Sequence, residues 1–314
     1  MTAPLRMRLD ELEVYVTRVA EATGIPPAHL EKDFWVTEVL RGASNASETT
    51  GCSIIFKGGT SLSKAHRIIR RFSEDVDLVV VLSEGGRGAK DSTLKTFVAA
   101  AESTTGVEAT VDPSSATTGV KRTATFAYPT THRSALKPGV LMELGTRGGA
   151  LPNRRLPIQS LIAEHAQTVD LPVDFEEAAT VNLLVLEPVR TLVEKLVLLH
   201  HAAIAGDAQR RETTVRHYYD VDRLLRDDRV LSDLKSSPID VLAREVTEHS
   251  RAAGLPTVIR PSEGFAASPA WDLSATHSGE AAYSTVMDEL LWPDAPRASF
   301  AECCHRVHEL ADLL

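Results

Sequence analysis

The chain has 314 residues, of which 43% are apolar and 25% charged, so its composition is close to that of globular proteins and excludes wholesale disorder. This length suffices for one large domain or two ordinary ones, each with its own core. The formal net charge of -9 excludes a surface that attracts nucleic acid everywhere, so a polyanionic substrate would need a local basic patch.

The sequence predicts a cytoplasmic protein without a membrane segment. No apolar run approaches the ~20 residues that a bilayer span requires. The N-terminal stretch carries acidic residues where a signal peptide would have an uninterrupted apolar core. Zinc is conceivable at Cys303, Cys304, His305 and His308, but adjacent cysteines lack the separation typical of structural zinc sites. We instead expect two buried thiols on a terminal helix.

Two helices are predicted first. Apolar residues recur at helical spacing over 7–22 and over 28–41, and Pro26 and Pro27 mark the break between them. The following stretch, 45–51, is expected to form a polar loop.

A strand, a glycine pair and a second strand follow. Residues 53–56 are short, β-branched and apolar, and they run into Gly58 and Gly59, which is typical of a strand that enters a turn. A helix is expected over 61–70. A second strand is expected over 75–82, buried towards its end because it finishes in a continuous apolar run.

The remaining pattern is mixed up to about residue 180 and mostly helical afterwards. We expect a glycine-rich loop at 83–90, a helix at 94–102, strands at 107–111, 120–128 and 139–145, a connection at 149–157, a less regular segment, and then helices from Pro188 and at 215–227, 238–252, 280–291 and 298–314. The predicted domains are therefore 1–180, with the N-terminal helices, and 181–314, which is mainly helical.

The glycine pair and the second strand carry the chemistry. Gly58 and Gly59 allow backbone amides to approach a phosphate, the next helix offers its N-terminus to negative charge, and Ser61 can add a hydroxyl contact. Strand alternation places Asp75 and Asp77 on one face. Two such carboxylates are stable together chiefly when a divalent cation, most naturally Mg²⁺, neutralises them.

Neither feature is specific alone, since a glycine pair is usually a tight turn and Asp-x-Asp is common by chance. Their order, with a helix between them and an apolar strand after the second aspartate, favours phosphoryl or nucleotidyl transfer. The loop is not a Walker A motif, because the Gly-Lys-Ser/Thr ending is absent.

These residues resemble a known family. The segments GGTSLSK and RRFSEDVDL are similar to the first motif of the polymerase-β-type nucleotidyltransferases and, more narrowly, of the AbiEii/MenT nucleotidyltransferase toxins. Three further stretches carry the narrower resemblance: EKDFWVT at 31–37, EPVRTLVEKL at 187–196 and RHYYD at 216–220. The long interval between Gly59 and Asp75 fits this toxin branch better than the drug-modifying branch. Beyond about residue 230 the resemblance is only general.

The resemblance implies an α+β fold: a polymerase-β-like nucleotidyltransferase domain with a small mixed sheet, and a helical C-terminal domain that brings Lys195 and Asp220 to the cleft. It implies that Asp75 and Asp77 hold the Mg²⁺ or Mn²⁺ ions that bridge a triphosphate. Lys195 would neutralise that triphosphate as a point charge. Asp220 would anchor Lys195 or orient the nucleotide. Without the resemblance, Lys195 and Asp220 would be read as helix-surface residues.

Further site residues are also expected. A third metal-binding carboxylate is usual in the superfamily, and Glu143 is our candidate; the alternative is a solvated strand residue. Lys57, Lys64 and Arg71 are secondary candidates for contacts to phosphate.

The implied reaction transfers a nucleoside monophosphate from a nucleoside triphosphate to an RNA acceptor, such as the 3′ end of a tRNA, with release of pyrophosphate. The resemblance also implies a cognate antitoxin. Three alternatives remain: a small-molecule, drug-modifying nucleotidyltransferase, a nucleotide-binding regulator without turnover, and an interaction protein whose helical half binds a partner.

Overall fold

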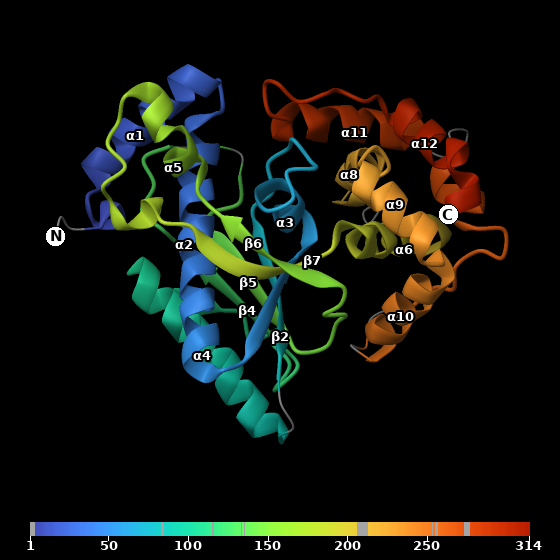
Figure 1. The fold of residues 1–314 in the computed structure, drawn as a ribbon, viewed down its shortest axis with the longest axis horizontal. Coiled ribbons are helices and arrows are strands. Elements are labelled where there is room, and N and C mark those ends of the chain that lie inside the picture. The colour runs from blue at the N-terminus through green and yellow to red at the C-terminus, as the bar shows by residue number, and fades with distance from the viewer. Residues whose placement is uncertain are drawn as a thin grey trace. The chain divides into compact units, whose positions relative to one another are not determined.

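The computed structural model describes residues 4–82, 85–114, 116–132, 134, 136–205, 213–252, 254, 257–272 and 277–314. The chain folds into two compact units (Figure 1). Unit 1 comprises Met1–Ala65, Phe72–Thr146 and Asn153–Val185. Unit 2 comprises His66–Arg71, Arg147–Pro152 and Leu186–Leu314, so two short segments from the first half of the chain belong to the second unit.

Unit 1 is built on a mixed seven-stranded sheet in the order β3-β4-β5-β2-β1-β7-β6. The strands are β1 (Ser53–Lys57), β2 (Asp75–Val81), β3 (Ala109–Val111), β4 (Lys121–Phe126), β5 (Val140–Gly145), β6 (Asn153–Ile158) and β7 (Val181–Leu186). β1 is antiparallel to β2 and parallel to β7, and β2 is parallel to β5. The predicted α+β class with a mixed sheet is confirmed, but the sheet is larger than the small one that we expected.

The two strands that enlarge the sheet were not predicted. We expected a connection over 149–157, and the structure places the edge strand β6 there. The sequence of β6 contains Pro157 and two arginines, which an edge strand tolerates because one side of it makes no ladder hydrogen bonds. β7 lies in the segment that we read as less regular.

The helices of unit 1 are η1 (Leu5–Met7), α1 (Leu9–Thr23), α2 (Pro27–Thr50), α3 (Gly58–Lys64), α4 (Arg87–Thr105), α5 (Leu161–His165), η2 (Ala166–Val169) and η3 (Glu176–Ala178). α2 contacts β1, β2 and β5, and α4 packs beside it against β4 (Figure 1). These helices bury one face of the sheet, which is why β2 is apolar at Val76, Leu78 and Val80.

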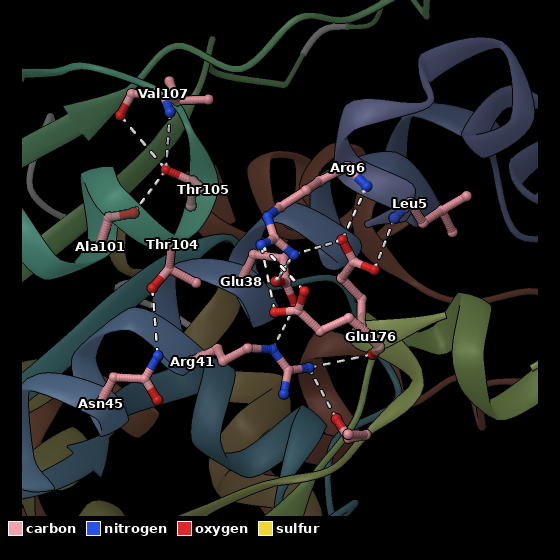
Figure 2. Close-up of polar contacts among 12 residues, drawn as sticks. Leu5, Arg6, Glu38, Arg41, Asn45, Ala101, Thr104, Thr105, Val107 and Glu176 are labelled. Carbon is pink, nitrogen blue, oxygen red and sulfur yellow. Dashed lines mark hydrogen bonds and ion pairs between the residues drawn. The ribbon is translucent and has the colours of Figure 1, made fainter. Parts of the chain in front are cut away.

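The polar loop predicted at 45–51 was wrong, because α2 continues to Thr50. The small residues here serve close packing of two helices: a Cβ atom on Gly42 would lie 2.5 Å from the Cα atom of Ala101 in α4. On the solvent side of the same contact, Asn45 donates a hydrogen bond to Thr104 at 3.5 Å (Figure 2). Small and polar residues therefore indicated a helix–helix contact rather than a loop.

Two other boundaries differ from the predictions. The helix expected over 61–70 begins at Gly58 and ends at Lys64, and Arg67 beyond it has a positive φ of 58°. The helix expected over 94–102 begins at Arg87, so the predicted glycine-rich loop is shorter; residues 83 and 84 of it lie outside the described part.

Unit 2 is mainly helical, with α6 (Pro188–Ala205), α8 (Arg216–Leu224), α9 (Asp228–Ser236), α10 (Ile239–Ala252), η4 (Phe265–Ala267), η5 (Pro269–Trp271), α11 (His277–Leu290), α12 (Phe300–Glu309) and η6 (Ala311–Leu313). α6 packs against α8 and α10, and α12 packs against α8 and α11. The predicted helical character is confirmed, whereas α9 was not predicted. The thiols of Cys303 and Cys304 are buried on α12, as expected. None of the described helices combines the length and the apolar composition that a membrane span requires.

Candidate active site

Gly58 and Gly59, here called the glycine turn, follow directly after the end of β1 at Lys57 and form the start of α3. Gly58 has a φ of 76°, a conformation that glycine adopts without the penalty that other residues incur. A Cβ atom at this position would lie only 2.2 Å from Oδ2 of Asp77. Ser61 is buried, and its hydroxyl donates to the carbonyl oxygen of Gly58 at 2.9 Å. Glycine is therefore required at position 58 because a carboxylate lies directly against the turn.

Asp75 and Asp77 stand at the start of β2, on the same face. Val76 between them is fully buried, whereas both aspartates are half-buried, so the strand alternates as its sequence predicts. Asp77 is the register partner of Lys57 on β1. The two carboxylates thus lie at the end of the sheet where β1 enters the turn.

Thr60 connects the turn to these aspartates, although we did not single it out from the sequence. Its hydroxyl donates to the carbonyl oxygen of Asp75 at 2.5 Å and lies 2.9 Å from Oγ of Ser73. Thr60 is fully buried. The first turn of α3 therefore holds the first residue of β2 in place, and a threonine between the glycine pair and Ser61 was the signal for this.

The structure places Glu143 beside Asp77, because β5 pairs with β2 in a register that makes the two residues partners. Its carboxylate, however, pairs with the Nζ atom of Lys121 at 2.8 Å. Among the described residues, no three histidine, cysteine, aspartate or glutamate side chains form a group that could hold a metal ion. The role of Glu143 as a third metal ligand remains a prediction, as does the role of Lys57 in phosphate contact.

A second cluster of charge lies within unit 2, around Asp220 on α8. Arg71 donates from Nε to Oδ1 and from Nη2 to Oδ2 of Asp220, both at 2.7 Å. The Nζ atom of Lys195, on α6, pairs with Oδ2 at 2.7 Å. Asp220 is 0% and Arg71 1% exposed, so these charges are withdrawn from water. A paired arrangement of this kind is required for buried charges.

His217, one turn before Asp220, completes this cluster. Its Nδ1 atom lies 3.0 Å from Nζ of Lys195 and 3.2 Å from Oδ2 of Asp220. Burial and the neighbouring Lys195 lower the pKa of His217 to about 3, so the ring is neutral at neutral pH. Because a protonated lysine can only donate, we assign Nδ1 as the acceptor and the ring proton to Nε2. His217 lies in the RHYYD stretch, but no role was predicted for it.

The environment shifts the pKa values of both charged partners. Burial opposes ionisation of Asp220, but Arg71 and Lys195 outweigh it and hold the pKa of Asp220 well below its ordinary value. Burial lowers the pKa of Lys195, and the attraction of Asp220 offsets part of this. With Lys195 protonated, two cations face one carboxylate, and all three groups are withdrawn from water.

Two of the expected phosphate contacts are engaged elsewhere. Arg71 is buried against Asp220, and Lys64 forms an ion pair with Asp33 on α2. A surface cavity of about 1130 Å³ in unit 1 is lined by Pro4 and by residues between Gln159 and Ala179, and none of the expected site residues belongs to its lining.

Comparison with known proteins gives the following relatives. The profile of the family described as "Nucleotidyl transferase AbiEii toxin, Type IV TA system" matches residues 39–293. Among solved structures, the chain is similar to MenT4, a nucleotidyltransferase toxin from Mycobacterium tuberculosis, with 16% sequence identity and a TM-score of 0.41, over 87% of this chain and 98% of that one. The search among curated proteins finds no significant match.

Proposed function

The chain belongs to the AbiEii family of nucleotidyltransferase toxins, and from this premise we propose that it transfers a nucleoside monophosphate from a nucleoside triphosphate to an RNA acceptor, with release of pyrophosphate. We propose the 3′ end of a tRNA as the acceptor, the cytoplasm as the location, and a cognate antitoxin as the protein partner. Such a modification would stop translation until the antitoxin restrains the enzyme.

The observation that carries this proposal is the contact between the glycine turn and the aspartate pair. The carboxylate of Asp77 lies against the backbone of Gly58, and Thr60 ties the same turn to Asp75. Backbone amides at the start of α3 are suited to phosphate oxygens. Catalysis of nucleotidyl transfer depends mainly on positioning the reacting groups and on stabilising the charge that develops in the transition state.

The donor set also fits a divalent cation. Asp75 and Asp77 supply hard carboxylate oxygens, the ligands that Mg²⁺ and Mn²⁺ prefer. A bound Mg²⁺ or Mn²⁺ would neutralise the triphosphate and stabilise charge on the leaving group. Asp75 and Asp77 would hold the cation, and Glu143 would join them only after leaving Lys121. The glycine turn would orient the phosphates, with Lys57 beside it.

In unit 2, Lys195 is the residue that we assign to the triphosphate. A protonated lysine has three N–H donors. Among the described residues, Lys195 directs its ammonium group towards Asp220 and His217. A third N–H therefore remains for a phosphate oxygen. Asp220 would act as a positioning residue, since Arg71 and Lys195 occupy both of its oxygens. Arg71 would then stabilise Asp220 rather than bind phosphate directly.

Transfer of label tests this proposal. The purified protein is incubated with total RNA, Mg²⁺ and each of the four nucleoside triphosphates in turn, labelled at the α-phosphate. We expect label to appear in a discrete small RNA, and we expect Asp75→Ala and Lys195→Ala to abolish it. Asp91→Ala is the matched control, because Asp91 is an acid of unit 1 that pairs with Lys95 and Arg122 instead.

The outcomes separate the alternatives. Label on a small molecule without RNA would support the drug-modifying reaction and contradict the RNA acceptor. Binding of nucleotide without any turnover would support the regulator. Toxicity in cells that survives Asp75→Ala would support the interaction protein.

A further inference from the structure

Three consecutive charged residues of α2 belong to the family-like sequence but have no role in the reaction as proposed. Glu31, Lys32 and Asp33 are only 5%, 1% and 5% exposed. Successive residues of a helix point about 100° apart, so the three side chains leave α2 in different directions. Because burying a charge is costly unless it is paired, the partner of each one is informative.

Asp33 holds the helix that starts with the glycine turn. Its Oδ1 atom forms an ion pair with Nζ of Lys64, the last residue of α3. Its Oδ2 atom accepts a hydrogen bond of 2.7 Å from the backbone N–H of Leu161, at the start of α5. Both members of the Asp33–Lys64 pair are shielded from water. Since α3 has only seven residues, fixing Lys64 also fixes Gly58 at the other end.

Lys32 holds the strand that carries the aspartates. Its Nζ atom pairs with the carboxylate of Glu74 and donates to the carbonyl oxygen of Lys137 at 2.6 Å. Glu74 directly precedes Asp75, the first residue of β2. The ion pair therefore acts on the same short piece of chain that Thr60 fixes from the side of the turn.

Glu31 supports the same arrangement from the loop between β4 and β5. Its carboxylate accepts a hydrogen bond from the hydroxyl of Thr130, and the backbone N–H of Thr131 lies 3.4 Å from Oε1. Lys137, the second partner of Lys32, lies in the same loop. One turn of α2 thus contacts the last residue of α3, the residue that precedes β2, and the loop between β4 and β5.

We propose that Lys32 and Asp33 are positioning residues for nucleotidyl transfer, Lys32 for the metal-binding aspartates and Asp33 for the phosphate-binding turn. This inference rests on the proposed function. Groups that hold a metal ligand in place commonly change metal affinity by about 10–100-fold when removed, and sub-ångström placement matters equally for a phosphate turn. Substitution of Lys32 should therefore weaken metal binding, and substitution of Asp33 should weaken nucleotide binding.

The Lys32 arm is tested with Lys32→Met, which keeps the length of the side chain but removes its charge. We expect the affinity for Mn²⁺, measured without nucleotide by electron paramagnetic resonance, to fall by at least ~10-fold. Lys32→Arg, which retains a donor for Glu74, should recover most of it. Glu74→Gln breaks the same ion pair from its more exposed side and should reproduce the loss even if Lys32→Met does not fold.

The Asp33 arm is tested with Asp33→Asn, which keeps the shape but weakens the contact with Lys64. We expect nucleotide binding at saturating Mn²⁺, measured by calorimetry with a non-hydrolysable triphosphate analogue, to weaken by ~10-fold. The Mn²⁺ affinity without nucleotide should stay within a factor of about two of that of the unmodified protein.

Glu38→Gln is the matched control. Glu38 is a buried acid on the same helix, but it contacts Arg41 at 3.0 Å and lies near Arg6 instead of the turn or β2 (Figure 2). We expect this substitution to leave both affinities unchanged. A general loosening of α2 would alter them in all the variants alike.

The outcomes are distinct. If Lys32→Met and Glu74→Gln are folded and bind Mn²⁺ as tightly as the unmodified protein, the positioning role of Lys32 is wrong. If Asp33→Asn binds the analogue normally, the role of Asp33 is wrong. If the unmodified protein binds neither Mn²⁺ nor the analogue, the proposed function itself fails, and the inference with it.

Discussion

The acidic residues of the two units illustrate opposite uses of a carboxylate. In unit 1, Asp75 and Asp77 are half-buried on one face of β2, and the carboxylate of Asp77 lies against Gly58. In unit 2, Asp220 is fully buried, and Arg71 and Lys195 already neutralise it. A carboxylate that the protein's own cations neutralise serves to hold its partners, whereas Asp75 and Asp77 are the residues that we propose hold a divalent cation. The same residue type is therefore the proposed ligand site in one unit and a support in the other.

A third acid shows that burial alone does not decide whether a carboxylate is ionised. Glu38 in unit 1 is as buried as Asp220 and also has arginines nearby (Figure 2). Burial raises the pKa of Glu38 to about 7, and the arginines offset only part of the shift, since Glu177 adds a second negative charge. For Asp220 the neighbouring cations outweigh the effect of burial on the pKa, because Arg71 binds the carboxylate through two hydrogen bonds. The geometry of the ion pairs, and not the depth of burial, therefore sets the protonation state of these two carboxylates.

The largest expected contrast between the two units is in the free energy of unfolding when Asp220 or Asp75 is replaced by asparagine. Asp220→Asn leaves Arg71 and Lys195 buried with too little negative charge, so we expect the free energy of unfolding to fall by about 3–5 kcal/mol. Asp75→Asn should change it by less than about 1 kcal/mol, because a half-buried side chain loses little. Urea denaturation followed by circular dichroism measures both. Equal losses in the two variants would remove the distinction between support and ligand site.

The second contrast concerns pH. Because the pKa of Glu38 is raised in the folded state, the unfolded state loses its proton first as the pH rises from about 4.5 to about 7. The protonated Glu38 therefore contributes up to ~3 kcal/mol to the free energy of unfolding. This contribution is present in full below pH 4.5 and is lost as the pH rises through 7. Denaturation midpoints between pH 4.5 and 8 should therefore fall less steeply in Glu38→Gln. An identical slope in the two proteins would mean that Glu38 ionises normally.

The smallest contrast separates two glycines with positive φ. Gly58→Ala should destabilise the protein by about 1–3 kcal/mol, since the new Cβ atom would meet the carboxylate of Asp77 as well as an unfavourable backbone conformation. Gly51→Ala, with a φ of 68° and nothing within 4 Å of the new atom, should cost only about 1 kcal/mol. Thermal denaturation compares them. If both cost the same, Asp77 does not lie against the turn.

Local patterns were sufficient to predict the turn, β1, β2 and the helical character of unit 2. The alternation in Asp75–Asp77 and the glycine pair depend only on neighbouring residues. Contacts distant in sequence could not be predicted in this way: Arg71 and Asp220 are 149 residues apart, and Lys32 and Glu74 are 42 apart. The strand β6 and the end of α2 were missed because edge exposure and the approach of α4 overrode the local composition.

The dependence of the transfer rate on divalent cation tests the central claim most directly. The initial rate of label transfer to RNA is measured against Mg²⁺ concentration for the unmodified protein and for Asp77→Asn. We predict a rate that vanishes with chelator, rises to saturation with Mg²⁺, and falls by at least ~100-fold in the variant at every concentration. A variant that transfers label at the unmodified rate would show that the aspartates beside the glycine turn do not carry the reaction.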